Sequence, residues 1–424
     1  MPASFHKMAT PKITANLQQV KAVNQKVIFS LIYQFAPLSR ADLTARTQLS
    51  PTTVSSLVDE LIKRGLVVNK GTKTTQSSGR KPIMLEIVPL GGYILSAELL
   101  CEGIYIAAYD IFCYEIGSIM EPIQDYADAG RCIIQAVAQL LEKLHLPEQR
   151  LWGLCLGVPG LIDPKRGVVT NSTIIPIHED NDFLHIVRSH FTNIPVILEN
   201  ESSLSAYAEK EIGNNAGLRN LIYIDINVGI GSGIILDGRL LRGSDGLAGE
   251  IGHLSVDLNG PKCLCGNRGC LERMANVPAL IQRVVYGMMS GRPTKVSALT
   301  GGDYNRINIH VLREAALDHD ELVLEAIDET ARILAAGISS VLNLLNPQAV
   351  ILGGDMTELG DILLSRIDHY VSQSALKAST GGKAANLYCS QIKGNAATLG
   401  GAKLLLDNLI KNTRLETFSS DFEP

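Results

Sequence analysis

Three cysteines and one histidine lie close together in one stretch of the sequence and could bind a metal ion together. Cys263, Cys265 and Cys270 fall within eight residues, and His253 precedes the first of them by ten residues. Three thiolates and one imidazole complete the tetrahedral ligand set of structural zinc sites, which leave no position for water. The spacing therefore predicts one structural Zn²⁺ ion per chain, which would hold an irregular loop that has little core of its own.

The alternative is that these cysteines are buried thiols or form a disulfide bond. A Cys263–Cys265 bridge would be badly strained, because a single residue separates the two. The other five of the eight cysteines are scattered singly and show no disulfide spacing. The nearby glycines Gly260, Gly266 and Gly269 let the backbone curl tightly around an ion. Free thiols and a thiolate zinc site suit a reducing cytoplasm, where we expect the protein to act.

The composition is that of a globular protein with two or three domains. The chain has 424 residues, of which 46% are hydrophobic and 19% are charged. No apolar run approaches the roughly 20 residues that span a bilayer. The first residues lack the apolar core of a secretory signal. We therefore expect a cytoplasmic protein with no transmembrane segment.

The charge is distributed unevenly along the chain. The formal net charge is −5, yet residues 1–86 contain twelve Lys and Arg against four Asp and Glu, which gives +8. The remaining residues carry −13. A basic N-terminal segment followed by an acidic remainder indicates that the first segment meets a polyanion and the rest does not.

The basic segment has the pattern of a winged helix-turn-helix domain, which we place at residues 17–88 after a flexible tail over 1–16. A helical pattern begins at Leu17 and stops at Pro37. Ser39-Arg40-Ala41-Asp42 predicts the capping box of a second helix, and Ser50-Pro51 opens a third that ends at Gly65. Two apolar stretches then predict the strands of a wing. The apolar face expected for the first helix consists of Val20, Val23, Val27, Ile28, Leu31, Ile32 and Phe35.

Small polar side chains at the start of the third helix would let it enter the major groove of DNA. The expected contacts with phosphates and base edges come from Arg40, Thr52, Thr53, Ser55, Ser56, Lys63 and Arg64. In the wing, Arg80 and Lys81 lie in a Gly-Arg-Lys-Pro turn that resembles the hooks placing an arginine in a narrow minor groove. The alternative is a module that docks another protein, but the positive charge favours DNA.

After about residue 88, apolar strands alternate with helices in two rounds. Strands are expected at 93–100, 104–111, 114–120, 151–157, 195–198, 221–226, 232–236, 349–352 and 387–389, and helices at 131–144, 321–345, 362–374 and 396–410. Two rounds predict two α/β lobes with a cleft between them. We place the lobes at residues 89–198 and 199–395, followed by a C-terminal helix at 396–412 and a flexible tail at 413–424.

Two motifs in this part of the chain resemble the signature of the ROK family of repressors and sugar kinases. They are Gly249-Glu250-Ile251-Gly252-His253 and the Cys-x-Cys-Gly-x-x-Gly-Cys-Leu-Glu run that ends at Glu272. The resemblance covers essentially the whole chain, including the winged helix that the repressor branch carries and the kinase branch lacks. It implies an actin-like ATPase fold for residues 87–424, with zinc on the four residues named above.

The resemblance also implies a sugar pocket, since in ROK kinases the sugar lies between the lobes beneath the zinc loop. Carried over by position, Asn200, Glu250, His253 and Glu272 would bind sugar hydroxyls, and Gly160 would line the pocket. Carboxylates and an amide suit a polyol, because each hydroxyl both donates and accepts a hydrogen bond. The alternative is that these are loop polar residues around a zinc ion, with His253 a ligand only.

A kinase of this family needs an Asp-x-Gly-x-Thr turn after its first strand, where backbone N–H groups meet phosphate. The matching stretch here, residues 96–102, has two acids and no glycine. The catalytic aspartate of the kinases is Glu201 here, whose longer side chain displaces the carboxylate by more than about 1 Å. We keep Glu201 as a pocket residue only. We expect no enzyme activity; a DNA-binding, ATP-dependent sugar kinase is the alternative.

These features together predict a repressor of sugar-uptake and phosphotransferase-system genes. It would bind a palindromic operator in double-stranded DNA as a homodimer or homotetramer. The inducing signal is either a sugar or sugar phosphate in the cleft, or sequestration by a protein. The resemblance is strongest to glucose-linked regulators, which implies the second route, with the cytoplasmic domain of the phosphotransferase-system glucose transporter as partner. Regulators responding to N-acetylglucosamine 6-phosphate are the alternative.

Overall fold

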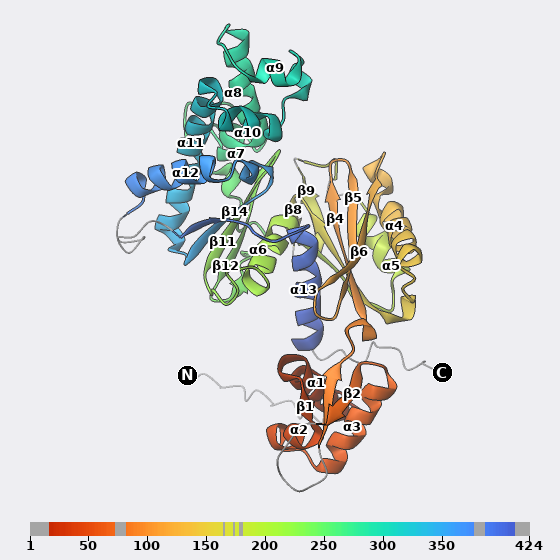
Figure 1. The fold of residues 1–424 in the computed structure, drawn as a ribbon. Coiled ribbons are helices and arrows are strands. Elements are labelled where there is room, and N and C mark those ends of the chain that lie inside the picture. The colour runs from red at the N-terminus through yellow and green to blue at the C-terminus, as the bar shows by residue number, and fades with distance from the viewer. Residues whose placement is uncertain are drawn as a thin grey trace, which may run out of the picture. The chain divides into compact units, whose positions relative to one another are not determined.

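A computed structural model describes residues 17–72, 82–163, 166–172, 174–177, 181–376 and 386–411 of the protein (Figure 1). The chain forms two compact units. The first, which we call the head, comprises Met1–Tyr93 together with Leu406–Pro424, and the second, the body, comprises Ile94–Leu405. The tails predicted at 1–16 and 413–424 lie outside the described residues.

The head contains three helices and a small sheet. The helices are α1 (Leu17–Phe35), α2 (Arg40–Thr47) and α3 (Pro51–Lys63), and the strands β1 (Leu38–Ser39), β2 (Val67–Thr72) and β3 (Ile83–Ile87) pair in the order β1-β3-β2. The predicted capping box is confirmed, since Ser39 Oγ accepts the Asp42 N–H at 3.2 Å and the Asp42 carboxylate accepts the Ser39 N–H at 2.9 Å. Ser50 caps α3 by accepting the Thr53 N–H at 3.1 Å. The helix-turn-helix and its wing are therefore present.

The apolar face predicted for the first helix is confirmed only in part. Ile28 and Ile32 are fully buried, whereas Val20, Val23 and Val27 are exposed by 43%, 41% and 42%. The reason is that α1 carries apolar residues on two faces and packs one of them against α2, α3 and β3. The core of the head is completed by Phe29, Leu43, Val54, Leu57, Val58, Leu61 and Leu85.

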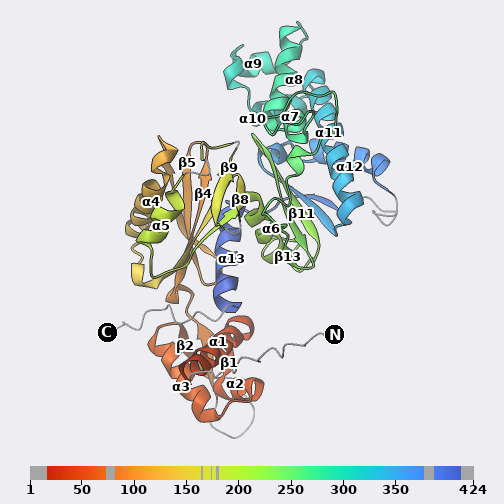
Figure 2. The same ribbon diagram turned by 180° about the vertical axis from the view of Figure 1, so that it is seen from behind.

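The body begins with a five-stranded sheet in the order β10-β7-β4-β5-β6. Its strands are β4 (Tyr93–Leu100), β5 (Gly103–Asp110), β6 (Glu115–Pro122), β7 (Leu151–Val158) and β10 (Val196–Asn200), and a two-stranded sheet of β8 (Leu161–Asp163) and β9 (Val168–Asn171) follows β7. Helices α4 (Ala129–Leu144) and α5 (Phe183–His190) cover one face, and α13 (Ala396–Lys411) lies on the other (Figures 1 and 2). The boundary between body and head falls inside α13.

A second five-stranded sheet has the order β13-β12-β11-β14-β15. Its strands are β11 (Leu221–Ile226), β12 (Ile230–Leu236), β13 (Arg239–Leu240), β14 (Ala349–Gly353) and β15 (Leu387–Cys389). Helices α7 (Leu271–Ala275), α8 (Val277–Met289), α9 (Val296–Thr300), α10 (Ile309–Leu317), α11 (Glu321–Leu345) and α12 (Asp361–Ser374) belong to this half. Both sheets with their helices form the actin-like, sugar-kinase-type body predicted from the sequence.

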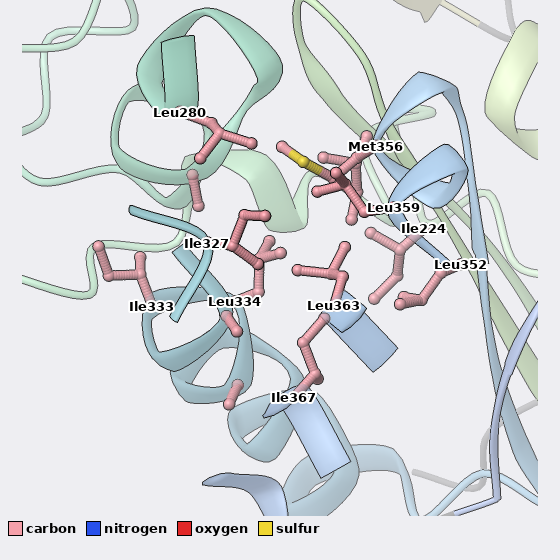
Figure 3. Close-up of a cluster of buried hydrophobic side chains, with 14 of the residues drawn as sticks. Ile224, Leu280, Ile327, Ile333, Leu334, Leu352, Met356, Leu359, Leu363 and Ile367 are labelled. Atoms are coloured by element: carbon pink, nitrogen blue, oxygen red, sulfur yellow. The ribbon is translucent and has the colours of Figure 1, made fainter. Parts of the chain in front are cut away.

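A cluster of buried apolar side chains packs the helices of this second half against its sheet (Figure 3). Ile224 and Leu352 of the sheet meet Leu334 of α11 and Ile367 of α12, and all four are at most 1% exposed. Each such side chain contributes about 1.5–3 kcal/mol when it is buried. The cluster includes Ile251 and Leu271, so it anchors both ends of the loop that carries the cysteines.

Helix α6 (Glu201–Glu211) packs against strands of both sheets of the body. It also approaches α13 closely, because a Cβ at Gly400 would lie 1.8 Å from the carbonyl oxygen of Leu204. Helix α6 thus connects the two halves. Among the described residues, no helix is long and apolar enough to cross a membrane.

Candidate functional site

The four predicted metal ligands come together in the body. Their ligand atoms all lie within 4.8 Å of one another. His253 Nδ1 is 3.8 Å from Cys263 Sγ, and Cys265 Sγ is 3.6 Å from Cys270 Sγ. With zinc bonds of about 2.0–2.3 Å, tetrahedral ligand atoms stand about 3.5–3.8 Å apart. The cluster therefore fits a zinc ion that is coordinated by protein atoms alone.

The backbone of the loop explains why these side chains meet. His253 ends a short 3-10 helix, and Ser255 forms a β-bridge with Cys270, which brings the last cysteine back to the histidine. Gly269 has φ +59°, and a Cβ there would lie 1.7 Å from the carbonyl oxygen of Asp257. Only glycine fits this position.

Burial and the neighbouring sulfur atoms raise the pKa of Cys270 to about 12. A thiol of that kind stays protonated at neutral pH unless a cation is bound beside it. Zinc would supply the positive charge that keeps three close sulfur atoms ionised. The donor set and its burial thus point to the same occupant.

The residues implied to form a sugar pocket lie in two groups, and the first is at the junction of β10 and α6. Asn200 Oδ1 accepts the Ser203 N–H at 3.0 Å and so caps α6. The Asn200 amide donates to Glu201 Oε2 at 2.8 Å and to the Gly160 carbonyl at 3.3 Å. Gly160 has φ +151°, where a Cβ would lie 2.6 Å from the Asn171 carbonyl oxygen.

The second group consists of Glu250, His253 and Glu272 at the ends of the cysteine loop. Burial raises the pKa of Glu250; nearby His253 lowers it, and nearby Glu272 raises it. Glu272 Oε2 accepts the N–H of Ile230, the first residue of β12, at 3.1 Å. The cysteine loop therefore holds acidic groups that can accept hydrogen bonds from hydroxyls.

Strand β12 touches both groups. Ile230 binds Glu272, and the next residue, Gly231, faces α6. A Cβ on Gly231 would lie 2.2 Å from Ser202 Oγ and 3.3 Å from Glu201 Oε1. The structure thus brings the first group and Glu272 against two successive residues of one strand.

An ion pair that the sequence did not suggest lies beside these residues. Arg242 Nη2 is 2.6 Å from Glu199 Oε2, and Arg242 Nε donates to the same oxygen at 2.8 Å. Glu199 directly precedes Asn200, and Arg242 lies in the loop that leads from β13 to Glu250. The partners lie 43 positions apart in the chain, so no local sequence pattern predicts the pair.

Three acidic side chains meet inside the body. They are Glu98 on β4, Glu201 on α6 and Asp225 on β11. Burial is the main cause that raises their pKa values, to about 7 for Glu98, about 8 for Glu201 and about 6 for Asp225. The charge of Asp225 raises the first two further. At neutral pH Glu201 therefore keeps its proton, whereas Asp225 is largely ionised.

Side chains of the protein link the turn after β11 to the turn after β14. Asn227 Oδ1 accepts the Asp355 N–H at 2.6 Å, and the Asn227 amide donates to Asp225 Oδ2 at 2.8 Å. The Tyr223 hydroxyl fills the space beside Gly353, where a Cβ would lie 1.8 Å from it. The Asp355 N–H group is therefore not free to bind a phosphate.

In the head, most of the predicted DNA-contacting residues lie on the surface of α3. Thr52, Ser56 and Lys63 are exposed, and Thr53 and Ser55 are half-buried. Small hydroxyl side chains thus line the outer side of the first turns of the helix. This arrangement keeps the helix surface low enough to approach base edges.

Two predicted arginines already have partners within the head. Arg40 Nη2 donates to Asp59 Oδ1 at 2.7 Å, and Arg64 Nη2 is 3.4 Å from Glu60 Oε1. Both acids lie on α3. Arg80 and Lys81, predicted in the wing tip, lie outside the described residues.

Comparison with known proteins gives consistent matches along the chain. The sequence model of the ROK family matches residues 120–408, and that of the MarR family matches residues 22–74. The xylose repressor of Bacillus subtilis (strain 168) is 32% identical over 399 residues, which cover 92% of this chain and 97% of that protein. The DNA-binding transcriptional repressor Mlc of Escherichia coli (strain K12) is 27% identical, covering 94% of this chain and 97% of Mlc.

The same relationship appears among solved structures. A crystal structure of a ROK family transcriptional regulator, described as a homolog of E. coli Mlc, matches with a TM-score of 0.79 at 27% identity. The match covers 94% of this chain and 99% of that one. Head and body together are therefore found in a regulator of similar length.

Proposed function

The chain belongs to the ROK family, and from that premise we propose that it is a repressor of sugar-uptake genes whose body responds to a sugar. The relatives matched over nearly the whole length are repressors, so the chain is a regulator rather than an enzyme. One observation carries the proposal. A helix-turn-helix head is joined to a sugar-kinase-type body in which the side chains of Asn227 and Tyr223 occupy the turn after β14.

The head would bind operator DNA in the cytoplasm. Helix α3 would enter the major groove with Thr52, Thr53, Ser55 and Ser56, while Lys63 reaches phosphates. Arg40 and Arg64 would reorient from Asp59 and Glu60, and Arg80 and Lys81 would contact the minor groove. Two heads would read a palindromic operator, so the active form would be a homodimer or homotetramer.

The body would bind a monosaccharide or its phosphate through Gly160, Asn200, Glu201, Glu250, His253 and Glu272. One carboxylate from each group, Glu201 and Glu272, lies against the start of β12, and the Asn200 amide binds the first of them, which supports a polyol ligand. The 32% identity to a protein named xylose repressor favours a sugar of the pentose or hexose class over a protein signal.

Zinc would act as a structural group. A zinc ion bound by His253, Cys263, Cys265 and Cys270 would cross-link the cysteine loop. The residues of the loop would then hold Glu250 and Glu272 in fixed positions. These carboxylates, and not the metal ion, would contact the sugar hydroxyls.

The match to Mlc over 94% of the chain supports a second candidate for the inducing signal. In that version the cytoplasmic domain of the phosphotransferase-system glucose transporter would sequester the repressor. A response to N-acetylglucosamine 6-phosphate is the further alternative. All three versions share the DNA-binding head.

Calorimetry and operator binding test the proposal together. The purified full-length protein is titrated with D-xylose, D-glucose, glucose 6-phosphate and N-acetylglucosamine 6-phosphate, and its affinity for operator DNA is measured with and without each. We expect one sugar to bind and to lower operator affinity. No heat with any sugar would favour the protein partner, and absence of salt-dependent DNA binding would overturn the repressor function.

A further inference from the structure

We propose that the Arg242–Glu199 ion pair is the closing contact of the effector site, a proposal that rests on the sugar-responsive function above. In this role Arg242 and Glu199 are positioning residues. The pair would tie the loop carrying Glu250 to the strand carrying Asn200. A sugar that hydrogen-bonds both side chains would then bind best when the pair is formed.

The ion pair joins the two sheets of the body at their edges. Glu199 belongs to β10, the end strand of the first sheet, and Arg242 follows β13, the end strand of the second. The two donated hydrogen bonds of Arg242, from Nε and Nη2, converge on one carboxylate oxygen. A contact between edge strands is well placed to change when the two halves move.

The loop that carries Arg242 has few fixed points of its own. It contains Gly243, Gly246 and Gly249, all with positive φ, and it is tied to β12 at both ends. At one end the Leu241 N–H donates to the Ile234 carbonyl at 2.8 Å, and at the other Ser232 Oγ donates to the Gly249 carbonyl. Arg242 adds the tie to the first sheet.

Glu199 also binds Asn200, the pocket residue that follows it in the chain. Its Oε2 atom binds Arg242, while its Oε1 atom accepts the backbone N–H of Asn200 at 3.2 Å. The carboxylate therefore connects the guanidinium to the residue that caps α6. Loss of the pair would free the Glu199 carboxylate to turn and would loosen Asn200.

Burial makes this ion pair sensitive to the loss of the arginine. The Glu199 side chain is 12% exposed, and that of Arg242 is 43% exposed. A buried carboxylate that loses its cation leaves an uncompensated charge, which is unfavourable. Arginine suits the contact because its planar group offers two N–H donors in fixed positions, which lysine lacks.

The test is a double-mutant cycle in the full-length protein. Arg242→Gln, Glu199→Gln and the double variant are compared with wild type by calorimetry with D-xylose, D-glucose and glucose 6-phosphate. We expect each single variant to weaken binding about tenfold and the double variant to be no weaker than either single one. Arg242→Lys should recover part of the affinity.

The control is Arg219→Gln, which removes an exposed pair in the same half of the body. Arg219 and Asp237 are 72% and 80% exposed and 3.8 Å apart, so this variant should bind sugar as wild type does. Operator affinity without sugar and the zinc content should stay unchanged in the Arg242 and Glu199 variants, and the double variant, which leaves no buried carboxylate unpaired, should melt as wild type does. These readouts separate positioning from a general loss of structure.

The outcomes distinguish this proposal from the proposed function. Wild-type protein that binds none of the sugars overturns the effector function and the closing contact with it. Wild-type binding that both single variants retain overturns the closing contact alone. Losses that simply add in the double variant would also overturn it, because the two residues would then act independently.

Discussion

Asn227 Oδ1 accepts the backbone N–H of Asp355 at 2.6 Å, and this bond links the turn after β11 to the turn after β14. The same amide donates to Asp225 at 2.8 Å, so the side chain is held from both ends. The Asp355 N–H is therefore already engaged within the protein.

The first prediction concerns nucleotide. Wild-type protein incubated with Mg-ATP and D-glucose or D-xylose should release no ADP in a coupled assay. Asn227→Ala frees the Asp355 N–H, yet it too should bind no ATP in equilibrium dialysis, because the Tyr223 hydroxyl still lies beside Gly353 and the ionised Asp225 still repels phosphate. Sugar-dependent ADP release by wild-type protein would contradict this and restore the kinase alternative.

The second prediction concerns pH. The pKa values of Glu98, Glu201 and Asp225 are raised to about 7, 8 and 6, so the folded body holds protons that the unfolded chain has already released. Stability from this cluster is present at low pH and is lost as pH rises through those values. The melting temperature should therefore fall between about pH 5 and pH 8.

Glu98→Gln tests the same cluster, because glutamine resembles the protonated carboxyl. At pH 8 the variant should be more stable than wild type by on the order of 1–3 kcal/mol, with a rise of about 2–4 °C per kcal/mol in melting temperature. At pH 5 the two proteins should melt alike. Asp237→Asn, at an 80% exposed carboxylate, is the control and should show no such pH dependence.

The third prediction concerns zinc. Protein purified without chelator should contain about one zinc per chain by elemental analysis, and the double variant with Cys263→Ser and Cys265→Ser should contain none. The double variant should lose repression while the head stays folded by circular dichroism. Cys389→Ser, outside the loop, is the matched control. Normal repression by the double variant would remove zinc from the mechanism.

The fourth prediction concerns DNA. Lys63→Ala should weaken operator binding and reduce the slope of log affinity against log salt by about one, as expected for the loss of one phosphate contact. Ser56→Trp should abolish specific binding, since a large side chain would keep α3 out of the groove. Lys393→Ala changes the charge equally in the body and should leave both quantities unchanged. An unaltered salt slope in Lys63→Ala would contradict the assigned contact.

Long, strongly periodic elements could be predicted from the sequence. The predicted bounds of β4 and α11 agree with the structure. An uninterrupted apolar run identifies the strand, and a helical pattern sustained over 25 residues identifies the helix. The cluster of His253 and the three cysteines was also predicted from sequence spacing. Their chemistry is local, so a short stretch contains all of it.

Helix α6 was missed for a physical reason. Its residues include Ser202, Ser203, Ser205 and Glu209, and all four are buried. A helix that packs against elements on several sides has no polar face, so the usual period is absent. Instead its polar groups are satisfied in place; for example, the Ser390 hydroxyl donates to Glu209 at 2.5 Å.

The remaining site features depend on distant parts of the chain. The Arg242–Glu199 pair spans 43 residues, and the Asn227–Asp355 bond spans 128. Only the folded arrangement of two sheets brings these partners together.

The side chains at the turn after β14 also bear on how such a chain can evolve. Replacing Asn227 alone would leave the Tyr223 hydroxyl beside Gly353 and the buried carboxyl of Glu201 in place. A return to phosphate transfer would therefore require several coordinated substitutions in a packed interior. Under the proposed function, a change in the sugar that the body recognises would require fewer.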